Sequence, residues 1–130
     1  MRPVFKNPTI NIGTIEPNSK IFIDFYFEGD QNKIVYVQKG CSCTGSEVML
    51  ENAIQFQFQE QDAQHMTKEK IINYPTKEYE FSKWIKVYFK SDDALYKIDE
   101  NTGNKSFNSN KPHQMLTFTG KVNLSNLKFN

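Results

Sequence analysis

Cys41 and Cys43 are the only cysteines of the chain, and they lie one residue apart in the stretch 39–44, Lys-Gly-Cys-Ser-Cys-Thr. Thiolates can bind metals, exchange with disulfides or act as nucleophiles. In an extended strand, residues two apart hold their Cα atoms about 6.5–7 Å from each other, which exceeds the comfortable range for a disulfide. We therefore expect no internal disulfide and predict that this stretch is architectural, with one thiol packed in the core and the other in a turn.

Other sources of chemistry are sparse in the sequence. His65 and His113 are the only histidines, and neither lies at a spacing typical of a zinc site or of a cysteine–histidine pair. No Gly-rich phosphate loop, His-Glu-x-x-His or Gly-x-Ser-x-Gly motif occurs. The paired acids at 92–93 and 99–100 are typical of solvated turns. We predict no catalytic residues, no cofactor and no metal, and thus no enzyme.

The composition favours one small β-rich domain. The 130 residues fit a single domain, and the 11 Phe and 6 Tyr suit pleated, half-buried surfaces. A formal charge of +1 provides no global field that would recruit nucleic acid or an anionic membrane. No apolar run approaches the roughly 20 residues of a membrane span, and residues 1–8 have no signal-peptide pattern. We expect neither nucleic acid nor membrane among the partners. Two cysteines one residue apart are not the disulfide framework of a small secreted domain, so a reducing compartment is favoured.

Alternation of apolar and polar residues predicts strands near 9–15, 20–27, 33–39, 47–50, 53–59, 79–90 and 115–124. The clearest is 20–27, in which Ile21, Ile23, Phe25 and Phe27 form one apolar face that should point inward. The segment 61–74 fits neither period and is expected to be a crossover with one helical turn.

A polar, Gly/Asn/Ser-rich stretch precedes the last strand. Within it, residues 95–98 and 105–107 read as the two strands of a projecting hairpin, an insertion spanning about 93–112. A short C-terminal tail, 125–130, carries Leu127 and Phe129.

About seven short strands with turns between them predict an all-β fold, an immunoglobulin-like β-sandwich comprising residues 1–130 as one domain. In that topology the strands near 33–39, 80–90 and 115–124 would share one sheet. The strands near 9–15, 20–27, 47–50 and 53–59 would form the other. Tyr36, Trp84, Tyr88 and Met115 would then face outward together.

Four motifs are similar to those of a known family. They are Asn11–Ile15, Cys41–Thr44, Phe81–Tyr88 with the following Ser91-Asp92, and Leu116–Val122. In order and approximate spacing they resemble a bacterial family of Ig-like domains of unknown function, related to the hydin and major-sperm-protein group, which has a Cys-Gly-Cys-Thr motif. Ser42 stands where that family usually has glycine, and the hairpin looks like an insertion.

The resemblance has implications for function. Most relatives carry an export signal, and a stand-alone, unexported Ig-like domain with a grown-out loop is similar to accessory and decoration domains of tailed-bacteriophage virions. It implies a non-enzymatic structural module located in the virion, assembled in the host cytoplasm, with capsid subunits as protein partners. The alternative is a scaffold or adhesion domain in the cytoplasm or cell envelope of a bacterium, and a thiol or metal protein is a third reading.

The outward aromatic face has two readings that the sequence leaves open. The aromatic side chains could form a hot-spot surface for a protein partner, or the crossover, the hairpin or the tail could cover them as a satellite core. The predicted protein-interface residues are Tyr36, Trp84, Tyr88, Met115, Leu95, Tyr96, Phe107, Leu127 and Phe129.

Overall fold

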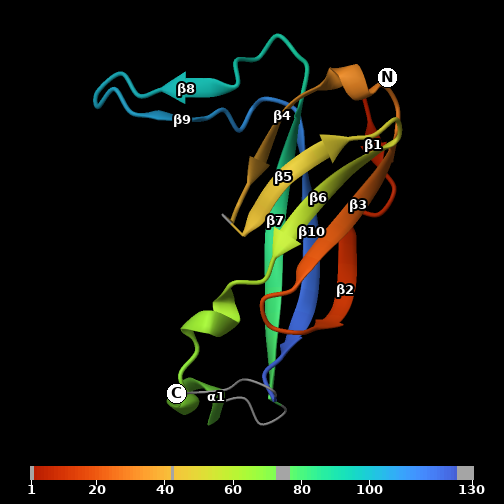
Figure 1. Cartoon of the computed structure of the whole chain (residues 1–130). Helices are drawn as coiled ribbons and strands as arrows, with labels where there is room; N and C mark the ends of the chain where they lie inside the picture. Colours follow the sequence, from red (N-terminus) through yellow and green to blue (C-terminus); the bar gives the residue numbers. More distant parts are fainter. Residues whose placement is uncertain (1, 42, 73–76, 126–130) are drawn as a thin grey trace.

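Two four-stranded sheets form the body of the protein, in a computed structural model that describes residues 2–41, 43–72 and 77–125 (Figure 1). The first sheet contains, in spatial order, β1 (Val4–Phe5), β3 (Lys20–Glu28), β6 (Ala53–Gln59) and β5 (Thr44–Met49). The second contains β2 (Thr9–Ile15), β10 (His113–Asn123), β7 (Glu78–Phe89) and β4 (Ile34–Lys39). The predicted all-β class is confirmed.

The core lies between the two sheets and follows the alternation of the sequence. Phe58 of β6 makes the link plain, because its ring lies 5.3 Å from that of Phe81 on β7 and 5.1 Å from that of Phe118 on β10, measured between centroids. Most of the predicted inward residues of the long strands are buried: Ile23, Phe25, Phe27, Phe81, Ile85, Val87, Phe89, Leu116, Phe118, Val122 and Leu124. Ile21, near the start of β3, is only partly buried. Burial of these side chains removes apolar surface from water and provides the main driving force for folding.

Strand β2 is not in the sheet that the sequence analysis assigned to it. It pairs in parallel with β10, for example Phe118 with Ile10, and so belongs to the second sheet. The edge of the first sheet is taken instead by the short strand β1, which pairs with β3. The prediction was wrong because alternation identifies which side of a strand faces the core but not which of two sheets the strand joins.

The remaining elements lie at the two ends of the sheets (Figure 1). Three short helical segments, η1 (Gln31–Lys33), η2 (Asp62–His65) and α1 (Lys68–Ile72), include the helical turn expected in the crossover. The predicted hairpin is present as β8 (Tyr96–Ile98) and β9 (Lys105–Phe107), and it projects from the end of the protein opposite α1. In the described part of the chain, no helix has the length and apolar character needed to cross a membrane.

Candidate protein-interaction site

The strand register brings the predicted outward aromatics onto one face of the second sheet. Tyr88 on β7 is paired with Tyr36 on β4 and with His113 on β10. Trp84 lies four residues from Tyr88 on the same strand, so it faces the same side. Met115 lies two residues from His113 on β10 and shares that face as well. The shared outward face was therefore predicted correctly.

The hairpin covers the part of this face that contains Tyr88. The ring of Phe107, on β9, stacks on that of Tyr88 with centroids 5.5 Å apart and an interplanar angle of 14°. The same ring contacts Tyr36 at 5.6 Å and Tyr96 at 4.9 Å. Tyr88 is only 1% exposed as a result. Of the two readings left open by the sequence, the hairpin covers Tyr88, while Tyr36 remains 39% exposed beside Phe107. The surface that a partner can touch here is therefore formed by Tyr36 and the hairpin.

Tyr88 also connects this aromatic cluster to the edge strand. Its hydroxyl donates a hydrogen bond to Oε1 of Gln38 on β4 at 3.1 Å. Burial raises the pKa of the Tyr88 phenol above its ordinary value, because the charged phenolate would lose hydration. The side chain thus remains neutral over the physiological range and acts as a fixed platform for Phe107.

Two buried polar residues fix the base of the hairpin. Lys111 is 5% exposed, and its ammonium donates to Oγ of Ser91 at 3.2 Å and to the carbonyl of Asp93 at 2.9 Å. Asn108, equally buried, donates from its side-chain amide to the carbonyl of Ala94 at 2.8 Å. Both residues lie in the polar, Gly/Asn/Ser-rich stretch that precedes the last strand. Their contacts close the loop on itself and restrict how the hairpin can move.

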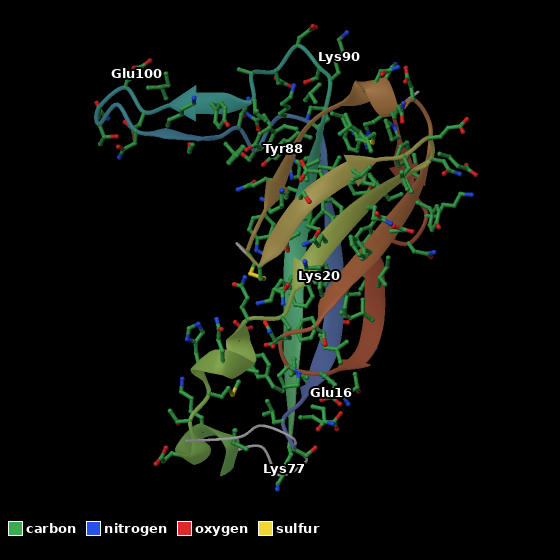
Figure 2. All side chains as sticks on the ribbon, in the orientation of Figure 1. Glu16, Lys20, Lys77, Tyr88, Lys90 and Glu100 are labelled. Carbon is green, nitrogen blue, oxygen red and sulfur yellow. A yellow bond between two sulfur atoms is a disulfide. The ribbon has the colours of Figure 1, made fainter. Side chains whose placement is uncertain are left out.

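The hairpin tip is ordered by its own hydrogen bonds. The Asp99 carboxylate accepts from the backbone amides of Asn101 at 2.8 Å and Thr102 at 3.2 Å, and the Gly103 amide donates to the Asp99 carbonyl at 2.7 Å. Just before this turn, Ile98 is 68% exposed, the highest value among the large exposed apolar side chains of the described residues. Figure 2 shows Glu100 at the far tip of the hairpin and Tyr88 at its root. Ile98 was not among the predicted interface residues. The sequence pattern identified 95–98 as a strand but did not show which of its side chains would be left exposed.

The part of this face that contains Trp84 and Met115 is open. Met115 is 49% exposed, and Trp84 is half-buried with its indole ring packed directly over the backbone of Gly40. The Lys86 ammonium lies 5.6 Å from the Trp84 ring centroid, which is within cation–π range. This part of the predicted surface is accessible to a partner.

The other predicted interface residues lie elsewhere. Leu95 is half-buried at the hairpin base, where its carbonyl accepts from the Asn108 amide at 2.8 Å. Leu127 and Phe129 lie outside the described residues, so the part of the prediction that concerns the tail remains a prediction.

Cys41 and Cys43 form a disulfide, with their Cα atoms 5.2 Å apart. The expectation of no internal disulfide was wrong because it assumed an extended strand at this point. The strand β4 ends at Lys39 and β5 begins at Thr44, so both cysteines lie in the connecting turn, closed by a hydrogen bond from the Thr44 amide to the Cys41 carbonyl at 3.1 Å. A turn brings the two Cα atoms within the range that a disulfide spans.

A second exposed surface, absent from the predicted interface, lies on the first sheet. Phe22 and Tyr26 of β3 point away from the core, as their alternation requires, and Val48 of β5 is exposed on the same side. Asp24, between the two aromatic residues, has its Oδ1 shielded from solvent without a hydrogen-bond partner. Alternation could have identified this surface, since it places Phe22, Asp24 and Tyr26 of β3 on the outward face of the strand.

Within residues 2–41, 43–72 and 77–125, no three His, Cys, Asp or Glu side chains are grouped so that they could hold a metal ion. An open depression of about 560 Å³ lies over β2, β7 and β10, lined by small and polar residues such as Gly13, Ser82 and Thr119. No family model, no curated protein and no solved structure matches the chain.

Proposed function

We propose that the protein is a non-enzymatic, immunoglobulin-like structural module that binds a protein partner through its projecting hairpin. The strand order supports this architecture: β1-β3-β6-β5 corresponds to the ABED sheet of immunoglobulin domains, and β10-β7-β4 to the GFC sheet. The hairpin then occupies the connection between the F and G strands. Loops at the ends of such sandwiches are common binding elements because the sheets hold them rigidly.

The observation that carries this proposal is the combination of a fixed root and an exposed apolar tip. A two-stranded hairpin has marginal stability in water by itself. Here Phe107 packs on Tyr88 at the root, while Ile98 remains exposed near the tip. Because the arm is ordered before binding, little conformational entropy remains to be lost when a partner covers Ile98. Such preorganisation favours a binding role for the arm.

The proposed setting is a bacteriophage virion, in which this module would be an accessory or decoration protein bound to capsid subunits. The support for this setting is the resemblance of the four sequence motifs together with the insertion of an arm. A scaffold or adhesion role in a bacterium is the alternative, and it would use the same arm on a cell-envelope partner.

The test replaces the exposed side chain of Ile98 and leaves the contact between Phe107 and Tyr88 at the root unchanged. Tagged protein is produced in its native host, and lysates are fractionated by sedimentation to separate particles, envelope and free protein. We expect the wild-type chain in the particle fraction and Ile98→Asp among the free protein. Val48→Asp is the matched control, since it places the same charge at an exposed apolar position of the opposite sheet.

Each distribution has a clear meaning. If Ile98→Asp sediments with particles as the wild type does, the arm is not the contact. Wild-type protein in the envelope fraction would support the bacterial alternative over the virion. Wild-type protein that is found only as free protein, and in neither the particle nor the envelope fraction, would contradict the assembly role altogether.

A further inference from the structure

The turn that contains Cys41 and Cys43 is held at both ends by backbone hydrogen bonds to different sheets. Before the first cysteine, the Gly40 amide donates to the Trp84 carbonyl of β7 at 3.1 Å. At the second cysteine, the Cys43 carbonyl accepts from the Gln59 amide at the end of β6 at 2.9 Å. Neither bond involves a sulfur atom. The two cysteines are therefore kept near each other whether or not their sulfurs are bonded.

The disulfide itself adds little to the stability of the fold by chain entropy. A cross-link stabilises mainly by restricting the unfolded chain, and this effect decreases with the length of the loop that it closes. The two cysteines are separated by two positions in the sequence, so the loop is very short. A bond that contributes little to stability, in a turn that is fixed without it, can open and close while the protein remains folded.

The two sulfurs are in unequal surroundings. Cys43 is 4% exposed and belongs to the hydrophobic core, whereas Cys41 is partly exposed. The Cys43 amide donates to the Cys41 sulfur at 3.1 Å. A hydrogen bond of this kind favours the charged thiolate form of Cys41 when the disulfide is open. Cys41 is thus the more accessible of the two residues, and the buried Cys43 is positioned to close the bond again.

We propose that Cys41 and Cys43 form a thiol–disulfide exchange site, an activity independent of the hairpin and of the proposed partner binding. Its substrates are small thiols and disulfides that can reach Cys41. In the reducing direction, an external thiolate attacks Sγ of Cys41, the bond between the two cysteines breaks, and Sγ of Cys43 leaves as a thiolate and takes a proton.

The reaction is completed by a second external thiol. This thiolate attacks the external sulfur of the mixed disulfide, and Cys41 leaves as a thiolate. Two external thiols become one external disulfide, and the protein gains two electrons and two protons as a dithiol. Oxidation by an external disulfide follows the same steps in reverse, with Cys41 as the nucleophile and Cys43 as the resolving thiol.

The first experiment uses the wild-type protein in its folded state. It is treated with dithiothreitol without denaturant, and the thiols formed are alkylated and counted by mass spectrometry while near-UV circular dichroism reports on the fold. We expect two thiols with an unchanged spectrum, and under limiting iodoacetamide we expect Cys41 to be alkylated before Cys43. Resistance to dithiothreitol in the folded state, or reduction that abolishes the spectrum, would overturn the proposal.

The second experiment assigns the two roles. Cys43→Ser and Cys41→Ser are each incubated with oxidised glutathione, and the mixed disulfide is measured over time. We expect Cys43→Ser to acquire one glutathionyl group at Cys41 and Cys41→Ser to react at least about tenfold more slowly, because its remaining thiol is buried. Equal rates in the two variants would refute the assignment. If either variant fails to fold, the order of alkylation in the reduced wild type decides the same question.

Discussion

The Phe107 ring stacks on the Tyr88 ring with centroids 5.5 Å apart and planes 14° from parallel, which joins the projecting hairpin to the second sheet. These residues are 19 positions apart, and no backbone ladder between β9 and β7 holds them together. The stack is therefore one of the contacts through which the sheet can stiffen the arm, together with the contact between Phe107 and Tyr36.

Replacing Phe107 by Ala should loosen the arm and weaken the domain. We expect the free energy of unfolding to fall by about 2 kcal/mol, less than the ~3–5 kcal/mol of a fully buried Phe, because Phe107 is half-buried. Urea unfolding gives the free energy, and amide exchange over 96–107 gives the order of the hairpin. Ile98→Ala is the control, with an expected change within about 0.5 kcal/mol. Equal losses in the two variants would contradict the anchoring role.

Tyr88 should make the protein sensitive to alkaline pH. Its pKa is raised in the folded state by burial, so above about pH 10 the unfolded chain loses a proton that the folded chain retains. The contribution to stability is present in full below about pH 10 and is lost as the pH rises through the folded pKa.

The variant Tyr88→Phe tests this coupling. At neutral pH we expect it to lose about 1 kcal/mol through the missing hydrogen bond to Gln38. Above about pH 10 its stability should fall less steeply than that of the wild type. Urea unfolding at a series of pH values measures both effects. Parallel curves for the two proteins throughout the alkaline range would exclude Tyr88 as a source of the dependence.

The core could be predicted from the sequence where a strand has one buried face. Phe25 on β3, Val87 on β7 and Phe118 on β10 were assigned inward from alternation alone, and all three are buried. The sheet membership of β2 could not be predicted in the same way, because the pairing of Ile10 with Phe118 joins residues 108 positions apart. Local periodicity contains no information about such a partner.

The candidate site was less accessible to prediction because it depends on contacts between segments. The outward direction of Tyr88 follows from periodicity, but its covering by Phe107 depends on how the hairpin folds back. The burial of Lys111 is similar: a lysine in a polar loop is normally exposed, and here its ammonium finds acceptors at Ser91 and Asp93. The disulfide was missed because Cys41 and Cys43 were treated as part of an extended strand, whereas β4 ends at Lys39 and the two cysteines lie in a turn.

Glu60 is a buried carboxylate that joins two turns. It is 2% exposed, its Oε2 accepts from the Asn18 amide at 2.6 Å, and its Oε1 accepts from the Ala63 amide at 2.7 Å. In Glu60→Gln, an NH₂ group would face one of these amide donors. We expect a loss of about 2 kcal/mol in the free energy of unfolding, together with faster exchange of the Asn18 and Ala63 amides.

A control for Glu60→Gln is available on the hairpin. Glu100→Gln makes the same change at an exposed position, and we expect it to alter stability by less than about 0.5 kcal/mol. If the two variants unfold at the same urea concentration, the two amide hydrogen bonds of Glu60 do not stabilise the fold.

Gly120 should tolerate no side chain, because it lies where β10 and β2 change register. A Cβ at this position would lie 2.7 Å from Cζ of Phe81, 2.8 Å from Cγ1 of Ile12 and 2.9 Å from the carbonyl oxygen of Gly13. Because Phe81 is buried and the Gly13 contact is backbone, neither can move freely. We expect Gly120→Ala to lower the free energy of unfolding by about 1–3 kcal/mol.

The control for this prediction is the same substitution at Gly45, on the edge strand β5. There the nearest atom to a new Cβ is the Gln57 carbonyl oxygen at 3.6 Å, an ordinary contact. Ala restricts the unfolded chain more than Gly does, so Gly45→Ala should raise stability by up to about 1 kcal/mol. Thermal unfolding of both variants separates the two effects. A Gly120→Ala protein as stable as Gly45→Ala would mean that the β2–β10 contact can relax around a methyl group.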